Sequence, residues 1–96
     1  MEEKLEMDYS DMFLNSRTKT HGNFSDVAKV YDIIKTTLEN GKFYHEANAT
    51  QRTALNMIAY KLARIVSGNP WYGDHWKDVK GYAQLVLEHL GEDGNG

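Results

Sequence analysis

Residues 48–90 read NATQRTALNMIAYKLARIVSGNPWYGDHWKDVKGYAQLVLEHL, and this stretch decides the fold. Apolar residues recur in it at intervals of three and four, which is the period of an amphipathic helix. The stripes are Leu55, Ile58, Ala59, Leu62, Ile65 and Val66, then Trp76, Val79, Ala83, Val86 and Leu90. The pattern therefore predicts two helices, over residues 49–67 and 74–90, joined by a short turn that is rich in aromatic residues.

Capping residues set the predicted ends of these helices. Asn48 with Gln51 three residues later forms a capping pair, although Thr50 is a rival cap. Gly68 is a C-terminal stop, and the proline that follows prevents the first helix from continuing. Asp74 is expected to cap the second helix, where its carboxylate also suits the helix dipole.

Gly81 falls in the middle of the second predicted helix, where glycine costs about 1 kcal/mol relative to alanine. Close approach of another backbone or of a ligand is the usual compensation for such a glycine. The sequence therefore predicts a close contact at this position.

The preceding residues predict two more helices and a loop. A helix over residues 23–40 begins at the cap Asn23 and carries a stripe from Phe24 to Leu38. A shorter helix over residues 3–14 is indicated by four apolar residues at helical spacing, and residues 15–22 look like a polar loop. The four are Leu5, Tyr9, Met12 and Phe13. We expect an all-α bundle of three main helices plus this short one, forming a single domain over residues 1–91, with a disordered tail at 92–96.

Composition narrows the classes of function. A chain of 96 residues with 41% hydrophobic residues is typical of one soluble globular domain. It has no cysteine and no apolar run long enough for a signal peptide or a membrane span, so we expect a cytoplasmic protein. The net charge of −3 arises at the ends, and no dense basic stripe is present, which argues against double-stranded nucleic acid as a partner.

Charged residues on the two helices of the hairpin predict an ion pair. If the helices pack antiparallel, Arg64 falls level with Asp78, and Lys61 lies one turn further along, near Tyr82. Arg64 would then pair with Asp78. Asp74 and Asp78 could instead hold a divalent cation through paired carboxylates, but no second pair is spaced to supply further ligands. We therefore predict a structural ion pair, with no metal and no cofactor.

The loop before Phe24 is the better candidate for binding a ligand. It combines hydroxyls with the cations Arg17 and Lys19 and with His21, just ahead of a helix N-terminus, where free backbone N–H groups attract anions. It matches no phosphate-loop motif. We expect this loop to lie near the edge formed by Lys61, Arg64, Asp78 and Tyr82 and to frame a cleft for a small anion. The alternative is a solvated loop that only turns the chain.

Large aromatic residues in the loops suggest a contact surface. Trp71 and Tyr72 lie in the turn of the hairpin, and Phe43 and Tyr44 lie in the loop before it. They would either close the end of the bundle or contact a partner, since interfaces favour aromatic residues. Trp71 and Tyr72 are thus candidates for a homo-oligomer contact.

The all-α nucleoside triphosphate pyrophosphatases offer one test of catalysis. They hold Mg²⁺ with a Glu-Glu-x-x-Glu motif on one helix and Glu-x-x-Asp on the next. Glu2-Glu3-Lys4-Leu5-Glu6 matches the first half, but no Glu-x-x-Asp occurs in the chain. Hydrolysis by that mechanism is therefore disfavoured, and a degenerate, nucleotide-handling relative is the alternative reading.

From about Arg17 to Leu90, an ordered set of motifs resembles a family of small proteins of tailed phages and prophages. The segments are His21-Gly-Asn-Phe24, Ala54-Leu-Asn-Met-Ile58, Lys61-Leu-Ala-Arg-Ile65, Gly68-Asn-Pro70, Asp74-His-Trp-Lys-Asp-Val79 and Gly81-Tyr-Ala83. The resemblance implies an all-helical phage or prophage protein, but no particular activity. Two acids of the family pattern are amides here, Asn23 and Asn56, which argues against acid–base or metal chemistry at those positions.

The sequence as a whole favours a non-enzymatic binding or interaction module over an enzyme. No catalytic constellation is evident, since the four histidines are scattered and the serines lack a nucleophile-elbow context. We expect the partner to be another protein or a small anionic ligand.

Overall fold

A computed structural model of the chain describes residues 18–91. It contains the helices α3 (Phe24–Glu39), α4 (Ala49–Ser67) and α5 (Gly73–His89), and a 3₁₀ turn, η1 (Tyr44–Glu46). The predicted all-α bundle of three main helices is confirmed, and each boundary falls within one residue of its predicted position. The predicted helix at 3–14 and the tail at 92–96 lie outside the described residues.

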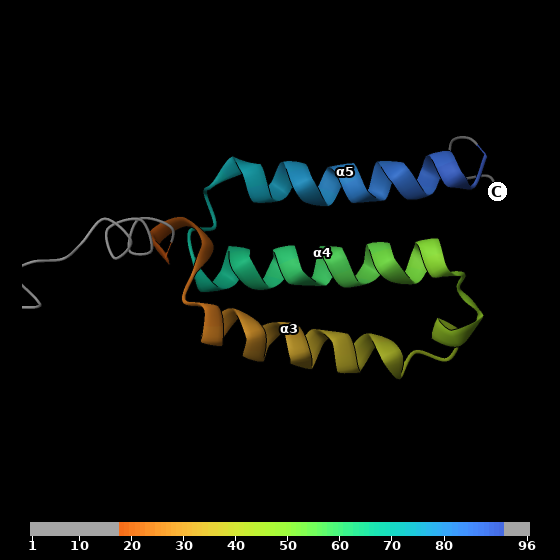
Figure 1. The fold of residues 1–96 in the computed structure, drawn as a ribbon, viewed down its shortest axis with the longest axis horizontal. Coiled ribbons are helices and arrows are strands. Elements are labelled where there is room, and N and C mark those ends of the chain that lie inside the picture. The colour runs from red at the N-terminus through yellow and green to blue at the C-terminus, as the bar shows by residue number, and fades with distance from the viewer. Residues whose placement is uncertain (1–17, 92–96) are drawn as a thin grey trace, which may run out of the picture.

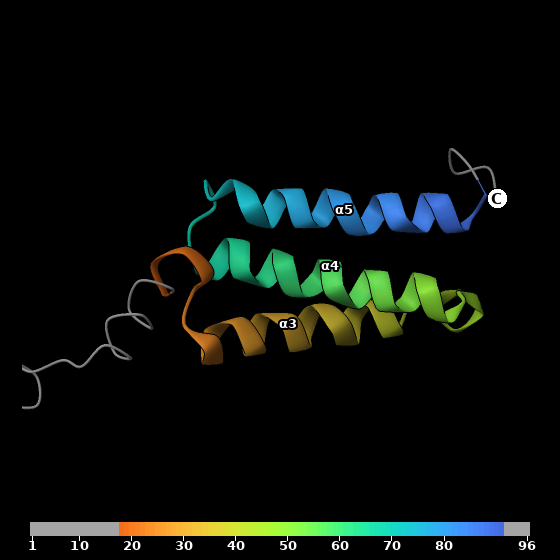
Figure 2. The same ribbon diagram turned by 45° about the horizontal axis from the view of Figure 1, so that its top comes forward.

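The three helices lie side by side in one layer. Helix α4 runs between α3 and α5 in both views of the chain (Figures 1 and 2). It packs against both neighbours, whereas α3 and α5 make no extensive contact with each other. Because short connections join successive helices, each helix runs antiparallel to the next (Figure 1). The central helix therefore has two packed sides, and the layer has two broad faces.

Two of the predicted caps are confirmed. The Asn23 side chain accepts hydrogen bonds from the backbone N–H groups of Ser25 and Asp26. Asn48 and Gln51 form the reciprocal capping box, with bonds of 2.8 and 2.9 Å between side chain and backbone. These bonds satisfy N–H groups that a helix start leaves without intrahelical partners.

Two local predictions were wrong. Asp74 does not cap α5, because the helix begins one residue earlier, at Gly73, and Tyr72 holds the cap position without a side-chain bond. Residues 18–21, assigned to a loop, are helical. Gly22 ends that helical turn with a φ of 84° and donates its N–H to the Thr18 carbonyl, as a glycine C-cap does.

The interior of the layer contains few fully buried apolar side chains. Among the described residues, its buried apolar side chains are Val27, Ala54, Ala59, Ala63 and Ile65. Three of these five are alanines, so α4 approaches its neighbours through small side chains. Several residues of the predicted stripes are instead exposed, including Phe24, Leu55, Val66 and Trp76.

Candidate functional site

One end of the layer holds a junction between the N-terminal segment and the α4–α5 turn. We define the junction as Thr20, His21 and Gly22 packed against Gly68, Asn69, Tyr72 and His75. The His75 ring meets the His21 ring edge-on, with 4.6 Å between centroids, and Tyr72 lies 5.1 Å from His75. His75 is only 1% exposed.

The Thr20 carbonyl oxygen is the centre of the junction. It accepts a hydrogen bond from His75 Nε2 at 3.1 Å and another from the Asn69 N–H at 3.3 Å. A carbonyl only accepts, so Nε2 carries the proton. Nδ1 of His75 is then an acceptor, and it is buried without a hydrogen-bond partner. His75 thus donates a hydrogen bond to the Thr20 carbonyl, which has no partner within its own helical turn.

The close approach expected at Gly81 occurs instead at two other glycines. A Cβ at Gly68 would lie 2.5 Å from the Thr20 oxygen, and one at Gly22 would lie 2.8 Å from Ser67. At Gly81 a Cβ would meet no heavy atom within 4 Å. The expected approach of another backbone to Gly81 was therefore wrong, whereas approach of a ligand there stays a prediction. The close backbone contact lies at the junction, in the motif Gly68-Asn69-Pro70.

The predicted pairing of Arg64 with Asp78 is also wrong in its partner. Lys61 Nζ lies 2.9 Å from Asp78 Oδ2 and bridges α4 and α5. The turn is tighter than assumed, since α5 begins at Gly73, and this moves Asp78 level with Lys61. Arg64 instead contacts Tyr60 of its own helix: it donates to the Tyr60 hydroxyl at 2.8 Å, and its guanidinium carbon lies 4.6 Å from the centre of that ring.

The surroundings of Asp78 lower the pKa of its carboxyl group. A hydrogen bond from the Lys61 ammonium lowers the pKa of the Asp78 carboxyl below its ordinary value of 3.8, and burial opposes this effect. The positive charge of Lys61 lowers the pKa further. Asp78 therefore stays ionised at neutral pH, held by a partner from the neighbouring helix.

The residues predicted to bind an anion are only partly brought together. Lys61, Asp78 and Tyr82 share one edge, where Tyr82 and Asp78 line the same shallow groove. His21 contacts Tyr72 and His75 at the turn, not Arg64. Lys19 is exposed, and Arg17 lies outside the described residues. The anion cleft and nucleotide handling both stay predictions.

The aromatic residues of the loops divide between two roles. Tyr72 closes the end of the layer by packing on His21 and His75. Trp71 is 90% exposed and Phe43 is 62% exposed. The homo-oligomer contact expected at Trp71 and Tyr72 stays a prediction, but Tyr72 is already engaged within the chain.

One broad face of the layer carries an aromatic pair and an ion pair. Tyr31 and Tyr60 meet edge-on there, joining α3 to α4 beside Arg64. The ion pair of Lys61 with Asp78 lies towards α5 on the same side. We call this side the polar face.

The opposite side carries apolar residues from all three helices, and sequence reasoning missed it. A groove of about 510 Å³ runs between α4 and α5 and is lined by Leu55, Ile58, Ala83 and Leu87. The 100° step per residue of a helix places further apolar residues on the same side. We define the apolar face as Val30, Ile33, Leu55, Ile58, Leu62, Val66, Trp76, Ala83 and Leu87.

The apolar face is open to solvent in the isolated chain. Ile33 and Val66 are each 67% exposed, Trp76 is 51% exposed, and Leu55 and Leu87 are each 36% exposed. The indole N–H of Trp76 donates to the Pro70 carbonyl at 2.8 Å, which ties the ring to the α4–α5 turn. The helix period also places Lys80 of α5 and Asp26 of α3 on this side, so the nine apolar residues share the face with two charged side chains.

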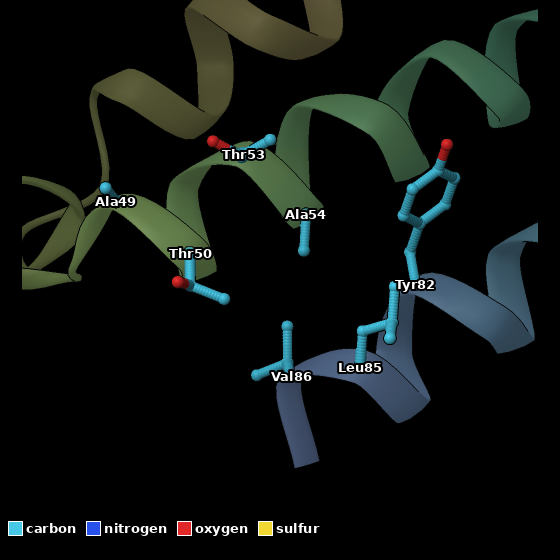
Figure 3. A pocket seen from close by; sticks show the side chains of 7 residues that line it. All are labelled: Ala49, Thr50, Thr53, Ala54, Tyr82, Leu85 and Val86. Carbon is cyan, nitrogen blue, oxygen red and sulfur yellow. The ribbon is translucent and has the colours of Figure 1, made fainter. Parts of the chain in front are cut away.

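The line of contact between α4 and α5, which we call the seam, also has a groove on the polar face. A second groove, of about 360 Å³, lies between Thr50 and Thr53 of α4 and Tyr82 and Leu85 of α5 (Figure 3). Ala54 and Val86 point into the space between the two helices (Figure 3). Small residues on α4 therefore leave room along the seam.

Within residues 18–91, no three His, Asp or Glu side chains lie close enough together to hold a metal ion. No helix in that range combines the length and apolar character needed to cross a bilayer. Comparison with protein families, with curated proteins and with solved structures finds no match to this chain.

Proposed function

We propose that this protein is a non-enzymatic interaction module and that the apolar face is its binding surface. The supporting observation is that all three helices contribute apolar side chains to this side, with Ile33, Val66 and Trp76 more than half exposed. Contiguous exposed apolar surface of this kind marks interaction sites in soluble proteins.

The polar face is the weaker candidate, because its charges already have partners within the chain. Asp78 is paired with Lys61, and the Arg64 guanidinium is engaged by Tyr60. An anion binding there would have to compete with these contacts. Within residues 18–91 the apolar face has no such partner, and covering it removes apolar surface from water at about 25 cal/mol per Å².

The resemblance to phage and prophage proteins supports a role in a phage-infected or prophage-carrying cell. The absence of cysteine agrees with work in a reducing cytoplasm. In this proposal the protein acts by assembling with another polypeptide, and no bond is made or broken.

Site-specific photo-crosslinking in cells tests the proposal. A photoreactive amino acid at Val66, on the apolar face, should give crosslinked protein species. The matched control is the same amino acid at Leu85, which is 58% exposed on the side of α5 opposite the apolar face. It should give few crosslinked species. Equal yields at both positions, or none at Val66, would contradict the proposed function.

A further inference from the structure

We propose that the partner of the apolar face is a second copy of this chain. Two three-helix layers would pack apolar face against apolar face and form a two-layer dimer. This inference rests on the proposed function, since it names the occupant of the same surface.

The first support is the small core of the single layer. Stable domains bury their apolar surfaces between at least two layers of secondary structure. Here the described residues bury five apolar side chains, of which three are alanines. The apolar face needs a partner whenever the chain is folded. A second copy of the same chain is always present, so it meets this requirement.

The area of the face fits a second copy. Helices α3 and α4 have 16 and 19 residues, and at 1.5 Å per residue they are about 24–28 Å long. Three helices at 8–10 Å spacing span about 28 Å across. The face therefore covers about 700 Å², close to the roughly 800 Å² that each partner buries in a stable interface.

The N-terminal residues of the chain are a poorer fit. The helix predicted there, over residues 3–14, would be about 18 Å long and 10 Å wide. It would cover about 180 Å², or roughly a quarter of the face. A cover in cis would therefore leave most of the apolar side chains in water.

The shape of the face is complementary to itself. Trp76 stands near the start of α5, whereas the groove lined by Leu55, Ile58, Ala83 and Leu87 lies nearer the end of that helix. A two-fold axis across the helices stacks α5 antiparallel on its copy. The Trp76 side chain of each chain then meets the groove of the other, as an isologous contact requires.

Sedimentation velocity of the full chain tests the inference. We expect a species of twice the 11.0 kDa chain mass. Trp76→Glu, which places a charge on the apolar face, should yield monomer, whereas Leu85→Glu on the other side of the same helix should remain dimeric. Trp71→Ser should also remain dimeric, because Trp71 lies in the turn.

A second measurement covers the case in which Trp76→Glu does not fold. Thermal unfolding of the unchanged chain should shift to higher midpoint with protein concentration, as mass action requires of a dimer. A full-length variant with serine at Leu5, Tyr9, Met12 and Phe13 should keep both the dimer and this dependence.

A monomer at all concentrations, with a constant midpoint, would overturn the inference, and so would a dimer that only Leu85→Glu dissociates. If such a monomer still crosslinks to another protein through Val66, the proposed function stands and only the choice of partner fails. If Val66 also gives no crosslink, both fail.

Discussion

At the scale of single residues, the glycines give the sharpest contrast. Gly81 is exposed in α5 with open space around it. It therefore lowers the stability of the fold only through the poor helix propensity of glycine. We predict that Gly81→Ala stabilises the fold by about 1 kcal/mol, measured by urea denaturation. An alanine there gains helix propensity and meets no neighbour.

Gly68→Ala is the matched comparison. Its new methyl group would have to occupy space within 2.5 Å of the Thr20 oxygen, so this variant should lower the free energy of unfolding. A destabilised Gly81→Ala variant would show that α5 has a close neighbour at Gly81, such as a ligand or a partner.

The ion pair between α4 and α5 gives a second prediction. A double-mutant cycle with Lys61→Met and Asp78→Asn should give a coupling energy of about 0.2–1 kcal/mol, since the Asp78 side chain is 47% exposed and water screens the pair. The same cycle with Arg64→Met should give coupling close to zero. Stronger coupling for Arg64 would restore the pairing expected from the sequence.

The pH dependence of this pair has a definite sign. The pKa of Asp78 in the folded chain is lowered by the hydrogen bond from Lys61. The contribution of the pair is therefore present above the unfolded-state value of about 3.8 and is lost as pH falls through the folded pKa. An NMR titration of the Asp78 carboxyl should show its pKa rising in Lys61→Met.

At the scale of helices, capping was predictable because it is local. Asn48 should contribute about 1 kcal/mol through its cap, so Asn48→Ala should lower the free energy of unfolding by that amount. Thr50, the rival cap, lies inside α4 and is exposed. Thr50→Ala should change the free energy of unfolding by less than about 0.5 kcal/mol. A larger loss would indicate that Thr50, and not Asn48, caps α4.

The junction gives a prediction about how one segment is held against another. His75→Ala removes a fully buried side chain and the donor to the Thr20 carbonyl, so we expect a loss of about 2 kcal/mol or more. Hydrogen exchange at the Gly22 and Asn69 amides should become faster. Lys77→Ala, an exposed neighbour, should leave these amides unchanged, and unchanged exchange in His75→Ala would contradict the junction.

The junction also shows where sequence reasoning stops. The four histidines are scattered along the sequence, and nothing in that pattern marks His75 as buried, yet it is the most buried polar side chain described. Its environment comes from the Thr20 carbonyl, 55 residues away in the chain. The signal that could have found it is Gly68, whose missing side chain marks a close approach.

At the scale of the whole molecule, the sequence predicted the helices better than their faces. Hydrophobic periodicity assumes that the most apolar stripe is buried. In α5 the predicted stripe is divided: Val79 and Val86 lie on the side towards α4, together with His75 and Tyr82, while Trp76 and Ala83 are exposed. An outer helix of a single layer has only one neighbour, so its apolar stripe can face solvent in the isolated chain.

The central claim is that the apolar face is covered in solution by a second copy of the chain. Alkylation of single cysteines tests it directly, because the natural chain contains no cysteine. In the isolated chain Val66 and Leu85 have similar exposures, 67% and 58%. Val66→Cys and Leu85→Cys should therefore react alike if the apolar face is open.

We predict that Val66→Cys reacts at least about tenfold more slowly than Leu85→Cys at high protein concentration, as expected when one chain in ten or fewer is monomeric. The two rates should converge as dilution separates the copies. Equal rates at every concentration would contradict the account.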